Sequence, residues 1–313
     1  MNVSIEKAIE ILTDGHPVAF PTETVYGLGA DAWNPDAIRQ VFDLKGRPSD
    51  NPLIVHIASR NLVDDFAADI PDHATKLMKA CWPGPLTLIF KKKPNVLDLI
   101  TAALDTVALR WPSHALAQEL IFRAGPLVAP SANKSGRPSP TKASHVTEDF
   151  GDDLPVIDGG ATQIGLESTV LDISELPLRI YRPGYIDKKD IERITGLDVI
   201  LTQEAGREQA TRSPGTKYSH YAPEATVRWL EEGESPDKKN ALYLVHSLQA
   251  EEQPHLLHYH QDYKKMATEL YDRFRQADHN RLEEVVVEPF DAQTREQHPI
   301  TEALVNRISK AIG

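Results

Sequence analysis

Apolar residues in the first 200 positions follow two patterns, a spacing of three or four and short uninterrupted runs. Between residues 5 and 12 they recur at helical spacing, and Ser4 before them can cap the helix. The same patterns predict further helices at 35–44, 74–81, 115–123 and 141–150. They predict strands at 18–20, 53–57, 86–90, 106–109, 127–129, 169–171 and 178–181. Strands and helices alternate irregularly, so we expect a mixed α/β domain that ends near residue 197.

The chain beyond this domain consists of a polar segment and a second patterned region. Residues 198–225 are rich in turn-forming residues, which predicts a linker. The linker contains Tyr218, His220 and Tyr221, more rings than a flexible spacer usually has, so we expect it to dock on the protein. From residue 226 onwards, strands and helices are predicted again, with strands at 241–245, 256–259 and 284–287. The expected organisation is therefore a domain at 1–197, a linker at 198–225 and a smaller α/β domain at 226–313.

Composition narrows the class of protein without identifying it. The 313 residues are enough for about two domains. A net charge of −12 disfavours a basic coat for nucleic acid. Cys81 is the only cysteine, which excludes an internal disulfide, a cysteine-based zinc site and iron–sulfur chemistry. Because no apolar run reaches the ~18 residues of a membrane span and the start lacks a secretion signal, we expect a cytoplasmic protein without a membrane partner.

Two segments near the start carry groups that suit a nucleotide. Residues 21–30 read Pro-Thr-Glu-Thr-Val-Tyr-Gly-Leu-Gly-Ala, where a strand runs into a loop whose glycines allow close approach of a ligand. Lys45 and Arg47 follow a predicted helix, and together they can clamp a triphosphate. Each segment also fits a structural role, as a turn and as a solvated surface pair. No Walker A loop is present, so a nucleotide would be held by other means.

Two later segments carry groups that suit a small anion. Arg110 ends a predicted strand and can bind a carboxylate, although a surface salt bridge explains it equally. The polar loop 129–141 precedes a predicted helix, where its hydroxyls and amides can hold a phosphate or a base, or simply cap the helix. No Ser/His/Asp or Cys/His nucleophile arrangement is evident, which argues against covalent catalysis.

Eight short motifs in a fixed order resemble those of the YrdC-like threonylcarbamoyl-AMP synthases. They are Pro21-Thr-Glu-Thr-Val-Tyr-Gly-Leu-Gly, Lys45-x-Arg-Pro, Pro52-Leu-x-Val-His, Trp82-Pro-Gly-Pro-Leu-Thr, Arg110-x-Pro, Ser131-Ala-Asn-x-Ser-Gly, Glu167-Ser-Thr-Val and Arg182-Pro-Gly. Residues 213–223 and the region after them resemble the long, two-domain branch of that family. The resemblance implies a YrdC-like twisted mixed sheet with flanking helices, followed by a smaller, Rossmann-like α/β domain.

The resemblance also implies a reaction. A nucleotidyltransferase of this family joins L-threonine, bicarbonate or CO2, and ATP into L-threonylcarbamoyladenylate and releases pyrophosphate. A downstream threonylcarbamoyl-transferase complex would then modify tRNA next to the anticodon, so tRNA itself would contact this chain at most indirectly or weakly. Mg²⁺ is expected with ATP, bound through phosphates and water rather than by protein ligands. The carbamate is unstable in water, so we expect a closable cleft, with Tyr218 to Tyr221 as its hypothetical lid.

The resemblance assigns roles to fourteen residues of this sequence. Five would hold L-threonine, with Arg110 on its carboxylate: Thr24, His56, Arg110, Ser131 and Ser168. Seven would contact ATP: Arg47, Asn51, Thr106, Asn133, Thr141, Arg182 and Tyr221. Lys45 and Arg47 would be catalytic, since they can neutralise charge on the phosphates, and Tyr26 would line the pocket. No protein ligand to a metal is expected.

Two other functions stay open at this point. Domains of this kind resemble RNA-binding modules, and a local basic patch of Lys45, Arg47, Lys134 and Arg137 would suit that use. A carbamoyl-transfer enzyme that forms a carbamoyl adenylate contains a similar domain, but such enzymes carry paired-cysteine zinc motifs. With Cys81 alone, this sequence lacks those motifs.

Overall fold

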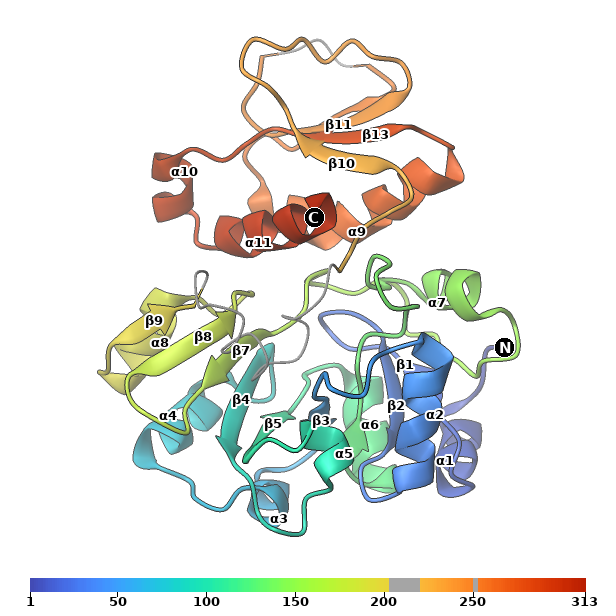
Figure 1. Ribbon diagram of the computed structural model, residues 1–313, viewed down its shortest axis with the longest axis vertical. Helices are drawn as coiled ribbons and strands as arrows, with labels where there is room; N and C mark the ends of the chain where they lie inside the picture. Colours follow the sequence, from blue (N-terminus) through green and yellow to red (C-terminus); the bar gives the residue numbers. More distant parts are fainter. Residues whose placement is uncertain (203–219, 250–252) are drawn as a thin grey trace.

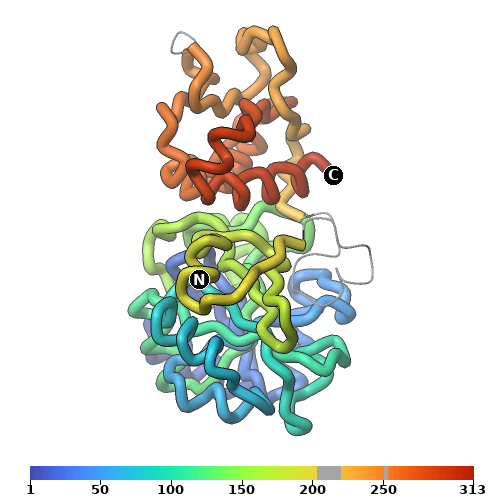
Figure 2. Tube along the Cα trace, turned by 90° about the vertical axis from the view of Figure 1, so that its left-hand side faces the viewer, coloured from blue at the N-terminus to red at the C-terminus, as the bar shows by residue number. Residues whose placement is uncertain are grey.

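A computed structural model describes residues 1–202, 220–249 and 253–313 and shows two lobes stacked along the long axis of the molecule (Figures 1 and 2). The larger lobe contains one nine-stranded sheet with the order β1-β2-β6-β3-β5-β4-β7-β8-β9. Its strands are β1 (Val18–Phe20), β2 (Gly27–Asp31), β3 (Ile54–His56), β4 (Leu86–Lys91), β5 (Thr106–Arg110), β6 (Leu127–Val128), β7 (Thr169–Asp172), β8 (Leu178–Arg182) and β9 (Val199–Leu201). The sheet is mixed, because the pairs β3–β5, β4–β7 and β8–β9 are parallel and the other pairs are antiparallel.

The helices of the first lobe begin where the sequence offers caps. Ser4 accepts a hydrogen bond from the Lys7 amide, and Asn34 accepts two from the first turn of the next helix, in which Pro35 is the first residue. The helices are α1 (Ile5–Thr13), α2 (Pro35–Lys45), α3 (Val63–Phe66), α4 (Asp72–Cys81), α5 (Asp98–Thr101), α6 (Ala115–Ala124), α7 (Ala143–Phe150) and α8 (Lys188–Thr195), with a 3₁₀ turn η1 (Arg60–Leu62) before α3.

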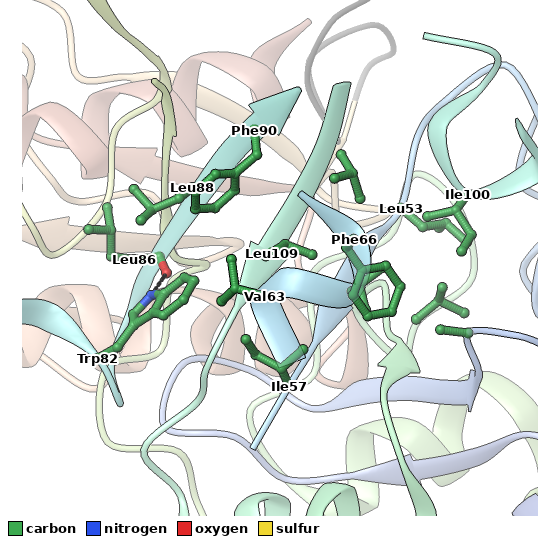
Figure 3. Close-up of a cluster of buried hydrophobic side chains, with 14 of the residues drawn as sticks. Leu53, Ile57, Val63, Phe66, Trp82, Leu86, Leu88, Phe90, Ile100 and Leu109 are labelled. Carbon is green, nitrogen blue, oxygen red and sulfur yellow. Dashed lines mark hydrogen bonds between the residues drawn. The ribbon is translucent and has the colours of Figure 1, made fainter. Parts of the chain in front are cut away.

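The main core of this lobe lies between β3, β4 and β5 of the sheet and the helices that cover them (Figure 3). Phe66, Phe90 and Leu109 are almost completely buried there. Trp82 turns its ring into the same cluster, and its indole N–H donates to the carbonyl of Leu86 at 2.7 Å. The indole thereby keeps its one donor satisfied while its rings fill the core.

The second lobe is a smaller α/β unit built on four parallel strands. These are β10 (Thr226–Trp229), β11 (Ala241–Val245), β12 (Leu256–His258) and β13 (Glu284–Val287), in the order β10-β13-β11-β12. Helices α9 (Tyr263–His279) and α11 (Ile300–Ile312) lie between this sheet and the first lobe, and α10 (Ala292–Gln297) lies at its side (Figure 1). The combination of a curled mixed sheet with a second α/β unit confirms the expected fold class.

The interface between the two lobes is held by charged side chains. Arg275 of α9 is buried, and it contacts Asp149 of α7 at 2.8 Å and the carbonyl of Pro138 at 2.6 Å. At the edge of the interface, Lys142 pairs with Asp272 at 2.8 Å. Helix α9 therefore docks on α7 and the loop before it through the pairs Arg275–Asp149 and Lys142–Asp272.

The structure adds two strands to the sheet that the apolar pattern does not predict. The sequence of segment 21–30 predicts a strand that runs into a loop, but Gly27–Asp31 forms β2, paired with β1 and β6. A side chain at Gly29 would place its Cβ 2.7 Å from the Phe20 ring, so this strand requires glycine here. Glycine is uncommon in strands, which is why the apolar pattern does not predict one. Strand β9 pairs with β8, so the sheet continues into the region predicted as linker at 198–225. None of the helices within the described residues is long and apolar enough to cross a membrane.

Candidate active site

One edge of the large sheet gathers the ends of four strands. Strands β3 and β5 are parallel and paired with His56 beside Arg110, so both end at this edge. Strand β7 starts there directly after Ser168, and the antiparallel β8 ends there at Arg182. A cavity of about 70 Å³ opens at this edge and is lined by seven of the fourteen predicted residues: Arg47, His56, Arg110, Ser131, Ser168, Arg182 and Tyr221.

Arg110 is held in place by a carboxylate that the sequence reasoning did not assign. Its Nη2 lies 2.7 Å from Glu23 Oε1, and the two side chains are only 5% and 4% exposed. The other oxygen of Glu23 accepts a hydrogen bond from the Ser113 amide at 3.1 Å. The buried Nε of Arg110 has no partner among the residues that the structure describes, so this guanidinium retains a donor for a ligand.

His56 lies beside Arg110 as a neutral imidazole. Burial lowers its pKa, and the charge of Arg110 lowers it further, to about 3. Its Nδ1 lies 3.3 Å from the carbonyl oxygen of Ile54. At neutral pH this side chain therefore offers hydrogen bonds to a ligand rather than a charge.

Arg182 and Ser168 are joined in one network. Arg182 donates to the carbonyl of Ser168 at 3.0 Å and to its hydroxyl at 3.2 Å. The same hydroxyl lies 2.7 Å from Thr87 Oγ1 on β4. Because the contacts come from β4 and β8, the two strands that flank β7, the position of Ser168 at the cavity is fixed from both sides.

Lys45 lies behind the cavity and supports the loop that follows β6. Its ammonium group donates to the carbonyls of Ser131 and Asn133, while Asn133 donates to the carbonyls of Lys134 and Arg137. Burial, followed by the charge of Arg47, holds the pKa of Lys45 well below its usual range. The side-chain oxygen of Asn133 is buried and lacks a partner in the described part of the chain.

The other predicted residues lie outside the lining of the cavity. Thr24, Asn51 and Thr141 are buried. Each either follows or precedes a lining residue in the sequence or belongs to a loop that contributes to the lining. Thr106 starts β5 whereas Arg110 ends it, which separates the two by roughly 13 Å along the strand. Tyr26 is fully buried and donates to the carbonyl of Gly160 at 2.7 Å, so the structure shows it supporting a loop.

The linker contributes two rings to the cavity. Tyr221 and His220 both line it, whereas Tyr218 of the hypothetical lid lies outside the described residues. Burial, together with the charge of Lys310, lowers the pKa of His220 to about 3. The lining also includes Glu167, which no argument from the sequence singled out. Glu23 and Glu167 both lie within motifs given above, next to residues for which the resemblance implies a role. Their position in those motifs is the sequence signal that indicates a role for these two acids.

The lining gives the cavity a clear chemical preference. Three guanidinium groups, those of Arg47, Arg110 and Arg182, line it together with one carboxylate, that of Glu167, and neutral hydrogen-bonding groups. Such a set binds carboxylates and phosphates. Within the described ranges, no three or more His, Cys, Asp or Glu side chains are grouped so as to hold a metal ion. The three guanidinium groups therefore favour an anionic ligand.

A mixed α/β protein with such an anion-binding edge, covered by a second α/β lobe, belongs to the class of two-domain proteins suited to act on anionic substrates. Two family models match the chain, one described as "Telomere recombination" over residues 10–184 and one described as "Threonylcarbamoyl-AMP synthase, C-terminal domain" over residues 186–313. The chain belongs to the threonylcarbamoyl-AMP synthase family, and it is an enzyme of the nucleotidyltransferase type.

Individual relatives agree with this assignment. The threonylcarbamoyl-AMP synthase of Bacillus subtilis is 42% identical over 330 residues, which cover 99% of this chain and 93% of that protein. The synthase of Pyrococcus abyssi is 49% identical over 226 residues, 71% of this chain and 66% of that one. Among solved structures, P. abyssi Sua5 complexed with L-threonine has a TM-score of 0.87 at 36% identity and covers 100% of this chain and 96% of that chain. E. coli YciO, at 22% identity and a TM-score of 0.53, covers 60% of this chain and 92% of its own and shows the fold alone.

Proposed function

We propose that the cavity at the sheet edge makes L-threonylcarbamoyladenylate and pyrophosphate from L-threonine, bicarbonate or CO2, and ATP. The observation that carries this proposal is the convergence of Arg47, Arg110 and Arg182 on one cavity beside neutral His56. A substrate pair with one carboxylate and one triphosphate needs such separated positive groups. The P. abyssi relative whose structure contains L-threonine supports the identity of the smaller substrate.

The amino acid fits the side of the cavity that contains Arg110. The carboxylate of L-threonine would bind Arg110, whose Nη2 is fixed by Glu23 and whose Nε has no partner among the described residues. His56, Ser131 and Ser168 would contact the rest of the molecule, with Thr24 nearby. Arg110 would thus set the orientation of the amine that becomes carboxylated.

The nucleotide fits the side that contains Arg47 and Arg182. These two guanidinium groups would bind phosphate oxygens, and Tyr221 would cover the nucleotide. The remaining assigned contacts are those of Asn51, Thr106, Asn133 and Thr141. In the reaction, an oxygen of the threonine carbamate forms a bond to the α-phosphorus of ATP while the bond from that phosphorus to the pyrophosphate oxygen breaks. The arginines stabilise the charge that moves onto the leaving pyrophosphate.

Magnesium, the tRNA pathway and the compartment are parts of the same proposal. The described residues provide no cluster of ligands for a metal, so Mg²⁺ would arrive with the ATP phosphates and share their charge. The adenylate would pass to a threonylcarbamoyl-transferase complex that modifies tRNA in the cytoplasm. The domains that do this would be the catalytic region at 1–197, the linker at 198–225 and the region at 226–313.

Binding of RNA by the first lobe alone finds less support. Of the basic patch considered for it, Lys45 is buried, and Lys134 donates to the carbonyl of Leu44 at 2.7 Å. Arg137 lies 3.5 Å from Asp149 and 3.8 Å from Asp278. Burial of Lys45 and the carboxylates beside Arg137 thus reduce the open positive surface that phosphate backbones require.

The test is release of pyrophosphate from ATP and Mg²⁺, with L-threonine and bicarbonate supplied together and each omitted in turn. Arg110→Lys keeps a positive charge opposite Glu23 but loses the forked contact, so we expect at least a tenfold loss of kcat/KM for L-threonine. Arg123→Met is the matched control, because Arg123 is 40% exposed and pairs with surface carboxylates of α1 and α6. Release that is indifferent to L-threonine would refute the proposal, and salt-dependent binding of tRNA without turnover of ATP would favour the RNA-binding alternative.

A further inference from the structure

Arg307 of α11 is a fully buried arginine that reaches from the second lobe into the first. Its Nε donates to Glu167 Oε2 at 2.7 Å, and its Nη2 contacts the carbonyl oxygen of Glu167 at 3.4 Å. Its Nη1 donates to the carbonyl of Pro183 at 3.0 Å. One guanidinium therefore joins the segment before β7 to the segment after β8.

Both segments lead directly into the cavity. Glu167 precedes Ser168, and Pro183 follows Arg182, so each carbonyl that Arg307 holds belongs to the neighbour of a residue in the lining. The guanidinium also lies over the ring of Tyr221, 5.6 Å from its centroid. Arg307 thus contacts two lining residues, Glu167 and Tyr221, and the neighbour of a third, Arg182, without itself being among the cavity residues.

Glu167 is the centre of this connection. Its carboxylate accepts hydrogen bonds from Ser139 at 2.5 Å, from Tyr271 of α9 at 3.0 Å and from Arg307. Burial alone would raise the pKa of Glu167, but the charges of Arg307 and Arg182 outweigh it and lower the pKa to about 2. The carboxylate is therefore ionised at neutral pH, and it ties two helices of the second lobe to the segment that carries Ser168.

The backbones of the two lobes approach closely at the same place. Gly165 has φ +80°, and a Cβ on it would lie 2.4 Å from the backbone of Thr268 in α9. Only a glycine fits there, and it allows α9 to lie directly on the segment that leads to Glu167. The second lobe therefore packs directly against the segment that leads to Glu167, and Arg307 can fix the position of that segment.

We propose that Arg307 is a positioning residue of the active site, through which the second domain sets the places of Ser168, Arg182 and Tyr221. This inference rests on the proposed function, since it concerns how the site holds L-threonine and ATP. It gives the C-terminal domain a part in substrate binding beyond anchoring the linker. Arg307 acts through its positive charge and through the separate donors of its guanidinium group, because a single donor could not reach Glu167 and Pro183 together.

The experiment compares full-length wild type, Arg307→Met and Arg307→Lys by calorimetric binding of L-threonine and by release of pyrophosphate, well below each protein's unfolding temperature. We expect Arg307→Met to weaken L-threonine binding and kcat/KM at least tenfold. Arg307→Lys should recover most of the unfolding temperature, because it keeps the charge opposite Glu167, but little of the kcat/KM. The matched control is Lys142→Met, which removes the Lys142–Asp272 pair of the same interface and should leave the kinetics within twofold of wild type.

A double-mutant cycle separates positioning from general weakening of the interface. In a Ser168→Ala background, Arg307→Met should lower kcat/KM less than threefold. The hydroxyl of Ser168, one of the groups that Arg307 positions, is already absent in that background. Equal losses in both backgrounds, full kinetic recovery in Arg307→Lys, or an equal loss in Lys142→Met would overturn the inference. If wild type binds L-threonine but releases no pyrophosphate, the proposed function fails, while the binding data still decide the role of Arg307.

Discussion

Replacing Glu23 with glutamine should destabilise the first domain far more than the same change on the surface. Glu23→Gln keeps the size of the side chain, so it creates no cavity. It removes the charge that faces Arg110 at 2.7 Å, and it turns the group that accepts the Ser113 amide into a donor or forces the amide to flip. With side chains 5% and 4% exposed, water cannot replace either interaction.

The magnitude follows from these two losses. A hydrogen bond to a charged group contributes about 1.5–3 kcal/mol, and breaking a buried ion pair by removing one partner costs about 3–5 kcal/mol. We therefore expect the free energy of unfolding to fall by about 3 kcal/mol or more. If the urea dependence of that free energy is about 3 kcal/mol per molar, the upper part of the usual range, the midpoint falls by about 1 M.

Urea unfolding followed by tryptophan fluorescence measures this shift, since Trp33, Trp82 and Trp111 lie in the first domain and Trp229 in the second. Glu119→Gln is the matched control. Glu119 pairs with Arg123 at 3.2 Å, but the two side chains are 51% and 40% exposed, and such pairs contribute about 0–1 kcal/mol. A midpoint in Glu23→Gln no lower than that of the control would refute the reasoning that burial makes the Arg110 pair strong.

Two further predictions concern His56 and Tyr26. Because the pKa of His56 is about 3 when folded and about 6.5 when unfolded, protons favour the unfolded state in that window and stability falls as pH drops below 6.5. Between pH 7.5 and 5.5 wild type should lose about 1.4 kcal/mol more than His56→Asn, and equal losses would contradict this. Tyr26→Phe removes the bonds to Gly159 and Gly160 and should cost about 1–3 kcal/mol. Burial raises the pKa of Tyr26 to about 12, so the pH–rate profile between pH 6 and 9 should keep its shape, and a changed profile would implicate the phenol in proton transfer.

The apolar pattern predicted the strands that are buried on both sides. Strand β4 is an unbroken apolar run apart from Thr87 and its terminal Lys91, so its sequence differs plainly from the loops around it. Strand β2 was missed because two glycines replace the side chains that usually mark a strand, and the reason lies in the Phe20 ring that packs over Gly29. Contacts between residues distant in sequence decide such cases, and local spacing does not contain them.

The site residues were predicted from sequence motifs. A motif identifies residues along the chain but not the distant residues that they contact in the fold. Arg110 was predicted, but Glu23, 87 positions away, was not. Arg307 gave a local signal that was not used. It occupies the apolar stripe of α11 together with Leu304 and Ile308, and a charge in such a stripe indicates a buried partner. The identity of that partner, 140 positions earlier, follows only from the fold.

The charged interface between the lobes also limits how this enzyme can be recombined with its relatives. A chimera that joined the first domain to a foreign second domain would bring Asp149 and Glu167 against whatever side chains that domain offers in place of Arg275 and Arg307. Each carboxylate would then lose its shortest ion pair across the interface, and the halves would separate or fold poorly. Domains from two different relatives can therefore be combined only when the acidic residues of one and the basic residues of the other still form these pairs. The sequences of the two lobes are expected to change together for this reason.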